Sequence, residues 1–98
     1  MNRLEARLAE LAAAGQTITY GALAREMGWR VQDLTAALET LMEMDAGKGQ
    51  PLRASLCEGR LSGGMPGRGF FEKAAELGCD LSDPAAFVTQ ARAALRGW

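Results

Sequence analysis

Histidine is absent from this 98-residue chain, and cysteine occurs only twice. The missing histidine excludes the usual patterns of zinc ligands. We expect Cys57 and Cys79 to be small core residues with reduced thiols, because a chain without a secretory signal normally keeps its cysteines reduced. A disulfide between them is the alternative. The chain is also too short for a deep site, so neither a metal nor a cofactor is expected.

Long hydrophobic runs and aromatic residues are scarce as well. No run reaches the roughly 18 apolar residues of a membrane span. Acidic residues interrupt the apolar ones at the N-terminus, unlike in a signal peptide. Only 6% of the residues are aromatic although 48% are hydrophobic, which predicts a core of leucine, alanine, methionine and valine.

The stretch from residue 19 to residue 41 predicts two helices joined by a tight turn. Thr19 can cap the first helix, and Gly28 can end it in the left-handed conformation. A second helix is expected over residues 31–45, because apolar residues recur there on one helical face: Val31, Leu34, Leu38, Leu41 and Met42. This spacing favours a helix-turn-helix, with a plain helical hairpin as the alternative. We expect Trp29, in the turn, to pack into the core.

A glycine-rich segment follows, with seven of the 12 glycines between Gly47 and Gly69. Within it, residues 52–57 alternate between apolar and polar, which predicts a strand with one buried face. A partner strand is expected near residues 60–62, and residues 65–68 fit a type II turn with glycine at the third position. Two strands after a helix-turn-helix would form a wing.

Further helices are expected at both ends of the chain. The first begins at the N-terminus, is closed by Gly15 and is followed by a short strand at residues 16–19. A short helix after the two phenylalanines and a last helix capped by Ser82 or Asp83 complete the chain. The sequence therefore predicts one domain over residues 1–98. Its fold class is α+β and mostly helical, a winged helix-turn-helix with a C-terminal helical extension.

One pattern extends over residues 16–71, just over half the chain. It consists of Thr19-Tyr20-Gly21-Ala22-Leu23-Ala24, Gly28, Pro51-Leu52, Arg60 and the run from Gly63 to Phe70. This order resembles the DNA-binding domain of the O6-alkylguanine-DNA alkyltransferases and their alkyltransferase-like relatives. In that family the tyrosine packs against the DNA backbone and helps to rotate a nucleotide out of the duplex. The resemblance implies a winged-helix fold and a DNA contact at Tyr20.

The chain departs from this family at the residues that carry its chemistry. The family's methyl acceptor is the cysteine of a Pro-Cys-His-Arg motif, whereas this chain has Ser55-Leu56-Cys57-Glu58 there. Cys57 is followed by a carboxylate that would raise the thiol pKa, and no histidine exists to form the thiolate. Leu34 stands where the family has the arginine that replaces a flipped base. We therefore expect no alkyl transfer and no enzymatic activity.

Charge is distributed unevenly along the chain. Residues 32–45 carry four acidic residues and no basic one, a pattern that would repel phosphates. Residues 46–73 carry five basic and two acidic residues, so the wing is expected to make any contact with DNA. The candidate nucleic-acid-binding residues are Tyr20, Arg30, Lys48, Arg53, Arg60 and Arg68.

The sequence thus favours a non-enzymatic winged-helix module that binds DNA weakly through a basic, glycine-rich wing. The alternative is a protein-protein interaction or regulatory domain that uses the same scaffold without binding DNA. A contiguous positive face would favour nucleic acid, and an apolar patch rimmed by acidic residues would favour a protein partner. Neither hypothesis involves a membrane, and the expected location is cytoplasmic.

Overall fold

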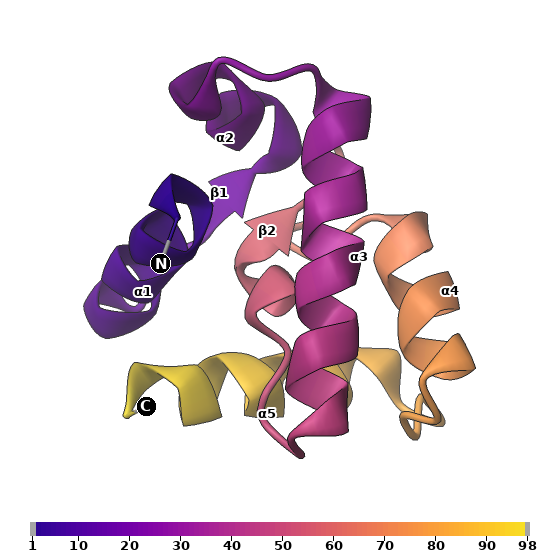
Figure 1. Cartoon of the computed structure of the whole chain (residues 1–98). Coiled ribbons are helices and arrows are strands. Elements are labelled where there is room, and N and C mark those ends of the chain that lie inside the picture. Colours follow the sequence, from indigo (N-terminus) through magenta and orange to yellow (C-terminus); the bar gives the residue numbers. More distant parts are fainter. Residues whose placement is uncertain (1, 98) are drawn as a thin grey trace.

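The computed structural model describes residues 2–97 and is mostly helical (Figure 1). The α-helices are α1 (Arg3–Ala14), α2 (Tyr20–Met27), α3 (Val31–Gly47), α4 (Arg68–Glu76) and α5 (Pro84–Arg96). The other elements are the two-residue strands β1 (Ile18–Thr19) and β2 (Cys57–Glu58) and a short 3-10 helix, η1 (Arg53–Leu56). This architecture confirms the α+β, mostly helical class. No helix within residues 2–97 is both long enough and apolar enough to cross a membrane.

Local side-chain chemistry sets several helix ends. The side chains of Asn2, Thr19 and Asp83 accept hydrogen bonds from backbone amides in the first turns of α1, α2 and α5. Gly15 and Gly28 adopt φ angles of 67° and 74°, which end α1 and α2 in the left-handed conformation that glycine favours. The predicted positions of these two glycines and of the Thr19 and Asp83 caps are therefore confirmed.

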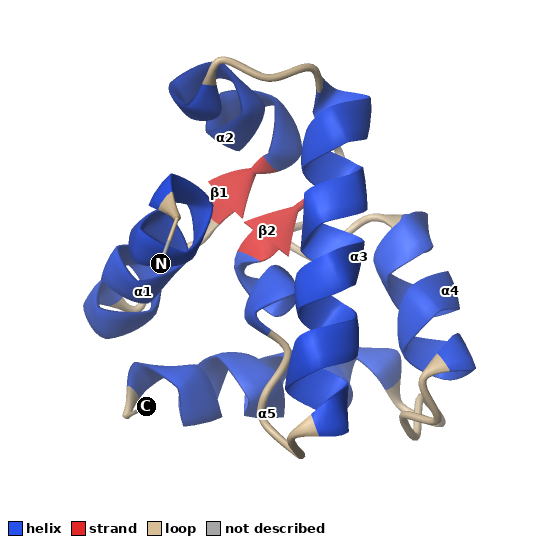
Figure 2. Cartoon of the chain, in the orientation of Figure 1, coloured by secondary structure: helices blue, strands red, loops and turns tan. Residues whose placement is uncertain are grey.

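The two strands pair in parallel, with Ile18 opposite Cys57 and Thr19 opposite Glu58 (Figure 2). The Thr17 hydroxyl extends this contact by donating a hydrogen bond to the Glu58 carboxylate at 2.6 Å. Since parallel strands need a crossover connection, α2, α3 and η1 lie in the chain between them. The sheet therefore holds the segment that enters α2 against the segment that leaves η1.

The strand predicted for residues 52–57 is wrong, because residues 53–56 form η1 instead. The expected alternation fails at Ser55 and Cys57, which are as buried as their apolar neighbours. The start of η1 is held by the Asp45 carboxylate, which accepts a hydrogen bond from the Arg53 amide at 3.0 Å. Only the last residue of the predicted strand belongs to β2.

The partner strand predicted near residues 60–62 is replaced by a turn. The Ser62 amide donates to the Gly59 carbonyl at 3.1 Å, and the Gly59 amide donates to the Met65 carbonyl at 2.8 Å, which closes the loop at its base. Gly67 has φ −71°, so the predicted type II turn at residues 65–68 is also wrong, and Gly67 instead caps α4. Within residues 2–97 the predicted wing is thus a loop rather than a hairpin.

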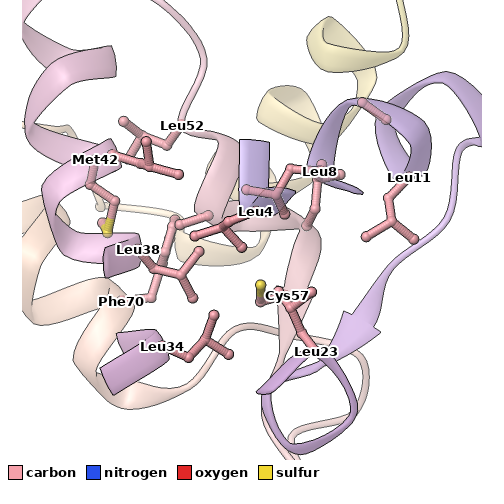
Figure 3. Close-up of a cluster of buried hydrophobic side chains, with 14 of the residues drawn as sticks. Leu4, Leu8, Leu11, Leu23, Leu34, Leu38, Met42, Leu52, Cys57 and Phe70 are labelled. Carbon is pink, nitrogen blue, oxygen red and sulfur yellow. The ribbon is translucent and has the colours of Figure 1, made fainter. Parts of the chain in front are cut away.

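The core lies between the helices and is built mainly from leucine. Figure 3 shows side chains from α1, α2 and α3 converging with Leu52, which precedes η1, and with residues of β2 and α4. Its fully buried members include Leu4, Leu8, Leu23, Leu34, Met42 and Cys57. The buried face of α3 agrees with the predicted stripe from Leu34 to Met42.

Two side chains at the turn between α2 and α3 are exposed against expectation. Trp29 is 40% exposed and Val31 is 49% exposed. Trp29 follows Gly28, the left-handed residue that ends α2, and so belongs to the turn between α2 and α3. Val31 is the first residue of α3 and lies before Leu34, where the buried face of the helix begins. Val31 lies on the surface described next.

Candidate nucleic-acid interface

An open depression of about 500 Å³ lies where the first half of α2 faces the start of α3 and the loop after β2. Its lining includes Tyr20, Arg25, Val31 and Arg60, and we call it the α2–α3 depression. Arg30 directly precedes Val31 as the N-cap residue of α3. Arg25 and Arg60, distant in sequence, thus line one depression, and Arg30 lies next to a lining residue in the chain. Arg30 and Arg60 are among the predicted binding residues.

Two of these arginines have no acidic partner among the described residues. Arg25 and Arg60 are exposed, and within residues 2–97 neither guanidinium forms a salt bridge or a hydrogen bond. Arg30 is different, since its guanidinium pairs with Asp33 at 3.2 Å. Two unneutralised cations therefore border the depression.

The start of α3 adds positive potential to the same surface. Arg30 makes no side-chain capping bond, so the first amides of α3 lack the acceptor that a serine or aspartate would supply. The helix dipole places a partial positive charge at this end, which favours anions such as phosphate. The exposed side chains that follow on the first turn are Val31, Gln32 and Asp33, and Asp33 pairs with Arg30.

Tyr20 forms the inner edge of the depression and is half-buried. Its hydroxyl accepts a hydrogen bond from the Gly67 amide at 3.0 Å, and a Cβ added at Gly67 would lie 3.3 Å from the tyrosine ring. Burial raises the pKa of the Tyr20 hydroxyl. The residue therefore joins the start of α2 to the start of α4, and one part of its surface remains available to a ligand in the depression.

Three of the four acidic residues of α3 form salt bridges, and Glu39 is the fourth. Asp33 pairs with Arg30, and Glu43 pairs with Lys73 at 2.6 Å. Asp45, which is 1% exposed, pairs with Arg53 at 2.8 Å. Asp33, paired with Arg30, is the acidic residue of α3 nearest to the depression along the helix.

The remaining candidate residues lie elsewhere. Lys48 is at the far end of α3, which is about 25 Å long for its 17 residues. The Arg53 side chain is 11% exposed and forms salt bridges with both Asp45 and Glu5. It therefore stabilises the fold and is not placed to contact a ligand. Arg68 is 91% exposed at the start of α4 and pairs with Glu72 on its own helix. The predicted basic surface is therefore split, and only its Tyr20, Arg30 and Arg60 part assembles.

Cys57 lies in the core rather than at the surface. It is fully buried on β2, and Figure 3 shows its sulfur beside leucine side chains. Burial raises the pKa of its thiol to about 12, so the thiolate is scarce at neutral pH. No group of three or more histidine, cysteine, aspartate or glutamate side chains within residues 2–97 is placed to hold a metal ion.

Two residues important to this surface were missed by reasoning from sequence. Arg25 lies on α2 away from the buried face, and the helical stripe of Leu23, Ala24 and Met27 could have identified its exposure. Arg92 gave no signal, because its role depends on tertiary contacts: its guanidinium donates to the Ser55 carbonyl at 2.7 Å and to the Gly64 carbonyl at 2.8 Å. It thereby ties the loop after β2 to α5.

Comparison with known protein families, curated proteins and solved structures found no match to this chain.

Proposed function

We propose that this chain is a non-enzymatic helix-turn-helix module that binds duplex DNA weakly. The bound surface is the α2–α3 depression with the exposed first turn of α3, rather than the two-stranded wing expected from the sequence. The observation that carries the proposal is the meeting of Arg25 and Arg60, both exposed and unpaired among the described residues, beside the start of α3. A helix start flanked by free arginines suits contacts with phosphates.

The arrangement of α2 and α3 supports this use of the surface. A turn at residues 28–30 joins them, and Leu23 and Ala24 of α2 are buried with Leu34 of α3. In helix-turn-helix proteins the N-terminal residues of the second helix approach base edges while neighbouring groups hold the backbone. Gln32 occupies such a position, since it is exposed one residue into α3.

Few phosphates can be neutralised by so few cations, so binding should be weak and sensitive to salt. We expect a dissociation constant of about a micromolar or higher at low salt, with little sequence preference. Arg25 and Arg60 would contact phosphates, and Tyr20 would pack against the sugar-phosphate backbone, as the resemblance to the alkyltransferase family implies. Catalysis has no part in the proposal, because the buried Cys57 has no base to activate it.

The experiment is a titration with fluorescently labelled duplex DNA at several salt concentrations. The double variant Arg25→Gln/Arg60→Gln should bind about tenfold or more weakly, and the slope of log affinity against log salt should fall by about two. The matched control is Lys48→Gln/Arg96→Gln, which removes the same charge from exposed positions outside the depression. Equal affinities of the two double variants, or a parent that does not bind at low salt, would refute the proposal.

A second candidate is a protein-binding domain on the same scaffold. What favours it is the exposure of Trp29 and Val31 at the turn, since aromatic side chains often anchor protein interfaces. A partner docked there should protect Trp29 and shift its fluorescence. If Trp29→Ala weakens self-association or capture of a partner while DNA has no effect on the tryptophan signal, this second candidate is the better one.

A further inference from the structure

The loop after β2 contains an unusual leucine. Leu61 is 97% exposed and has φ 63°, in the left-handed region that leucine rarely adopts. The other positive φ angles within residues 2–97 all belong to glycine: Gly15, Gly28, Gly49, Gly63, Gly64 and Gly78. The chain uses glycine freely at such positions, so a leucine here, with no core contact to justify it, calls for a functional reason.

The geometry of the turn makes leucine at this position more unusual. The Ser62 amide donates to the Gly59 carbonyl at 3.1 Å, which places Leu61 at the third position of a four-residue turn. A positive φ at the third position is typical of a type II turn, where glycine or asparagine is preferred. Leucine at this place raises the conformational energy of the folded chain and presents an apolar side chain to solvent.

The base of the loop is held firmly on the protein. The Gly59 amide donates to the Met65 carbonyl at 2.8 Å, and Arg92 of α5 donates to the Gly64 carbonyl at 2.8 Å. A Cβ at Gly59 would approach the Ser62 hydroxyl oxygen to 2.5 Å, so glycine permits the tight return of the chain. Leu61 therefore projects from a closed and anchored turn.

The position of the turn relates it to the proposed DNA surface. Arg60, the residue before Leu61, lines the α2–α3 depression together with Arg25. Residues 59–69 carry two arginines and no acidic residue. The tip therefore lies beside the groups that would hold phosphates, and its own charge is suited to an anionic partner.

The surroundings of Leu61 favour DNA over a protein partner. Its neighbours in the turn are Arg60, Ser62 and Gly63, so it is a lone apolar side chain rather than part of an apolar patch. A stable protein interface needs a central apolar cluster over a much larger area. A single protruding leucine flanked by arginine matches the apolar wedges that enter the minor groove and partly unstack a base step. Gly63 and Gly64 leave room for the backbone to approach the sugars.

We propose that Leu61 is a wedge that enters the minor groove of duplex DNA and partly unstacks one base step while α3 lies in the adjacent major groove. This inference rests on the proposed function, because it requires that the α2–α3 depression binds the duplex. Pyrimidine–purine steps such as TA unstack most easily, so the wedge should favour them. The Leu61 side chain thus adds a local deformation to a surface that otherwise contacts phosphates.

The experiment uses the full chain and a duplex of about 20 base pairs that carries 2-aminopurine at a central TA step and a fluorophore pair at its ends. The parent should raise the 2-aminopurine fluorescence and shorten the end-to-end distance. Leu61→Gly should be at least as stable as the parent, because glycine suits the left-handed position, yet it should bind about tenfold more weakly and leave the base step stacked. Asparagine also tolerates a positive φ, so Leu61→Asn should lose binding and unstacking as Leu61→Gly does. That result would exclude a loosened loop as the cause of the loss.

The controls separate this inference from the proposed function. Met44→Ala removes another exposed apolar side chain, 41% exposed on the second half of α3, and should bind and unstack as the parent does. If Leu61→Gly binds and unstacks like the parent while Arg25→Gln/Arg60→Gln loses affinity, the wedge is refuted and the proposed function stands. If the parent does not bind the duplex at all, both are refuted.

Discussion

The hydroxyl of Tyr20 and the amide of Gly67 are joined by a hydrogen bond of 3.0 Å between residues 47 positions apart. This bond closes α2 onto the start of α4, at the inner edge of the α2–α3 depression. The residue that the family resemblance assigns to DNA therefore also has a structural role. Substitutions at Tyr20 must be read with both roles in mind.

Removing that hydroxyl should destabilise the domain modestly. Tyr20→Phe keeps the ring and leaves the part-buried Gly67 amide without its acceptor, so we expect a loss of about 1 kcal/mol in the free energy of unfolding. Urea denaturation followed by circular dichroism measures it. Thr17→Val is the control, because it removes an exposed hydroxyl that bonds Glu58, and should change stability by less than about 0.5 kcal/mol. A larger loss in the control would contradict this account.

The buried stripe of α3 can be tested with a matched pair of substitutions. Leu34 has no exposed surface, whereas Val31, one turn earlier on the same helix, is 49% exposed. Leu34→Ala should cost about 2–5 kcal/mol, because it leaves a cavity between α2 and α3. Val31→Ala should cost less than about 1 kcal/mol. Similar losses from both, measured by the same denaturation, would mean that α3 is rotated relative to this structure.

The acid stability of the fold should depend in part on Glu5. Its carboxylate lies 3.0 Å from the Arg53 guanidinium, and this hydrogen bond lowers the pKa of Glu5 below its ordinary value of 4.5. Because the pKa of Glu5 is lower in the folded state, the stabilisation from its carboxylate is complete above pH 4.5. It is lost as the pH falls through the folded-state pKa. Glu5→Gln should thus be less stable than the parent near pH 7, by about 1 kcal/mol or less, and the difference should shrink below pH 4.

A control distinguishes this site from exposed acids. Glu10 also pairs with an arginine, Arg7, but its side chain is 69% exposed. Glu10→Gln should follow the parent's stability at every pH within about 0.5 kcal/mol. A constant deficit of Glu5→Gln from pH 7 to pH 3 would show that its effect is not the carboxylate charge.

The two cysteines should differ in reactivity. Cys57 is fully buried with a thiol pKa of about 12, whereas Cys79 is part-exposed. In the folded protein at pH 8, iodoacetamide should therefore modify Cys79 first and leave Cys57 untouched until the chain is unfolded. Mass spectrometry of digested protein gives the site. Incubation with duplex DNA that contains O6-methylguanine should likewise leave Cys57 unmethylated, and stoichiometric transfer to it would overturn the case against catalysis.

The helices were predictable from local chemistry, and the segment after α3 was not. Caps such as Thr19 and left-handed glycines such as Gly28 act within a few residues of themselves, so the sequence specifies them directly. Residues 53–56 show an alternation that suits a strand, but Asp45, eight residues earlier, captures the Arg53 amide and side chain and bends the chain into η1. That contact has no signature in the local pattern.

The candidate surface was predictable only in part, and for a similar reason. Arg30 and Arg60 could be chosen from composition, but their meeting with Arg25 depends on how the loop after β2 folds back over α2. Arg53 looked like a free cation of the wing, and its burial against Asp45 became visible only in three dimensions. Net charge along α3 gives no sign of such pairing, since it counts Glu43 and ignores Lys73, 30 residues away.

Through Arg92, the opening of the loop after β2 depends on α5, near the end of the chain. Its guanidinium spans the Ser55 and Gly64 carbonyls, so the loop opens only if α5 shifts or releases that side chain. Slow hydrogen exchange is therefore expected at the Gly59 amide, which donates to the Met65 carbonyl, although mobile loops usually open at little cost. The protection would be lost together with that of α5, because one guanidinium couples the opening of both segments.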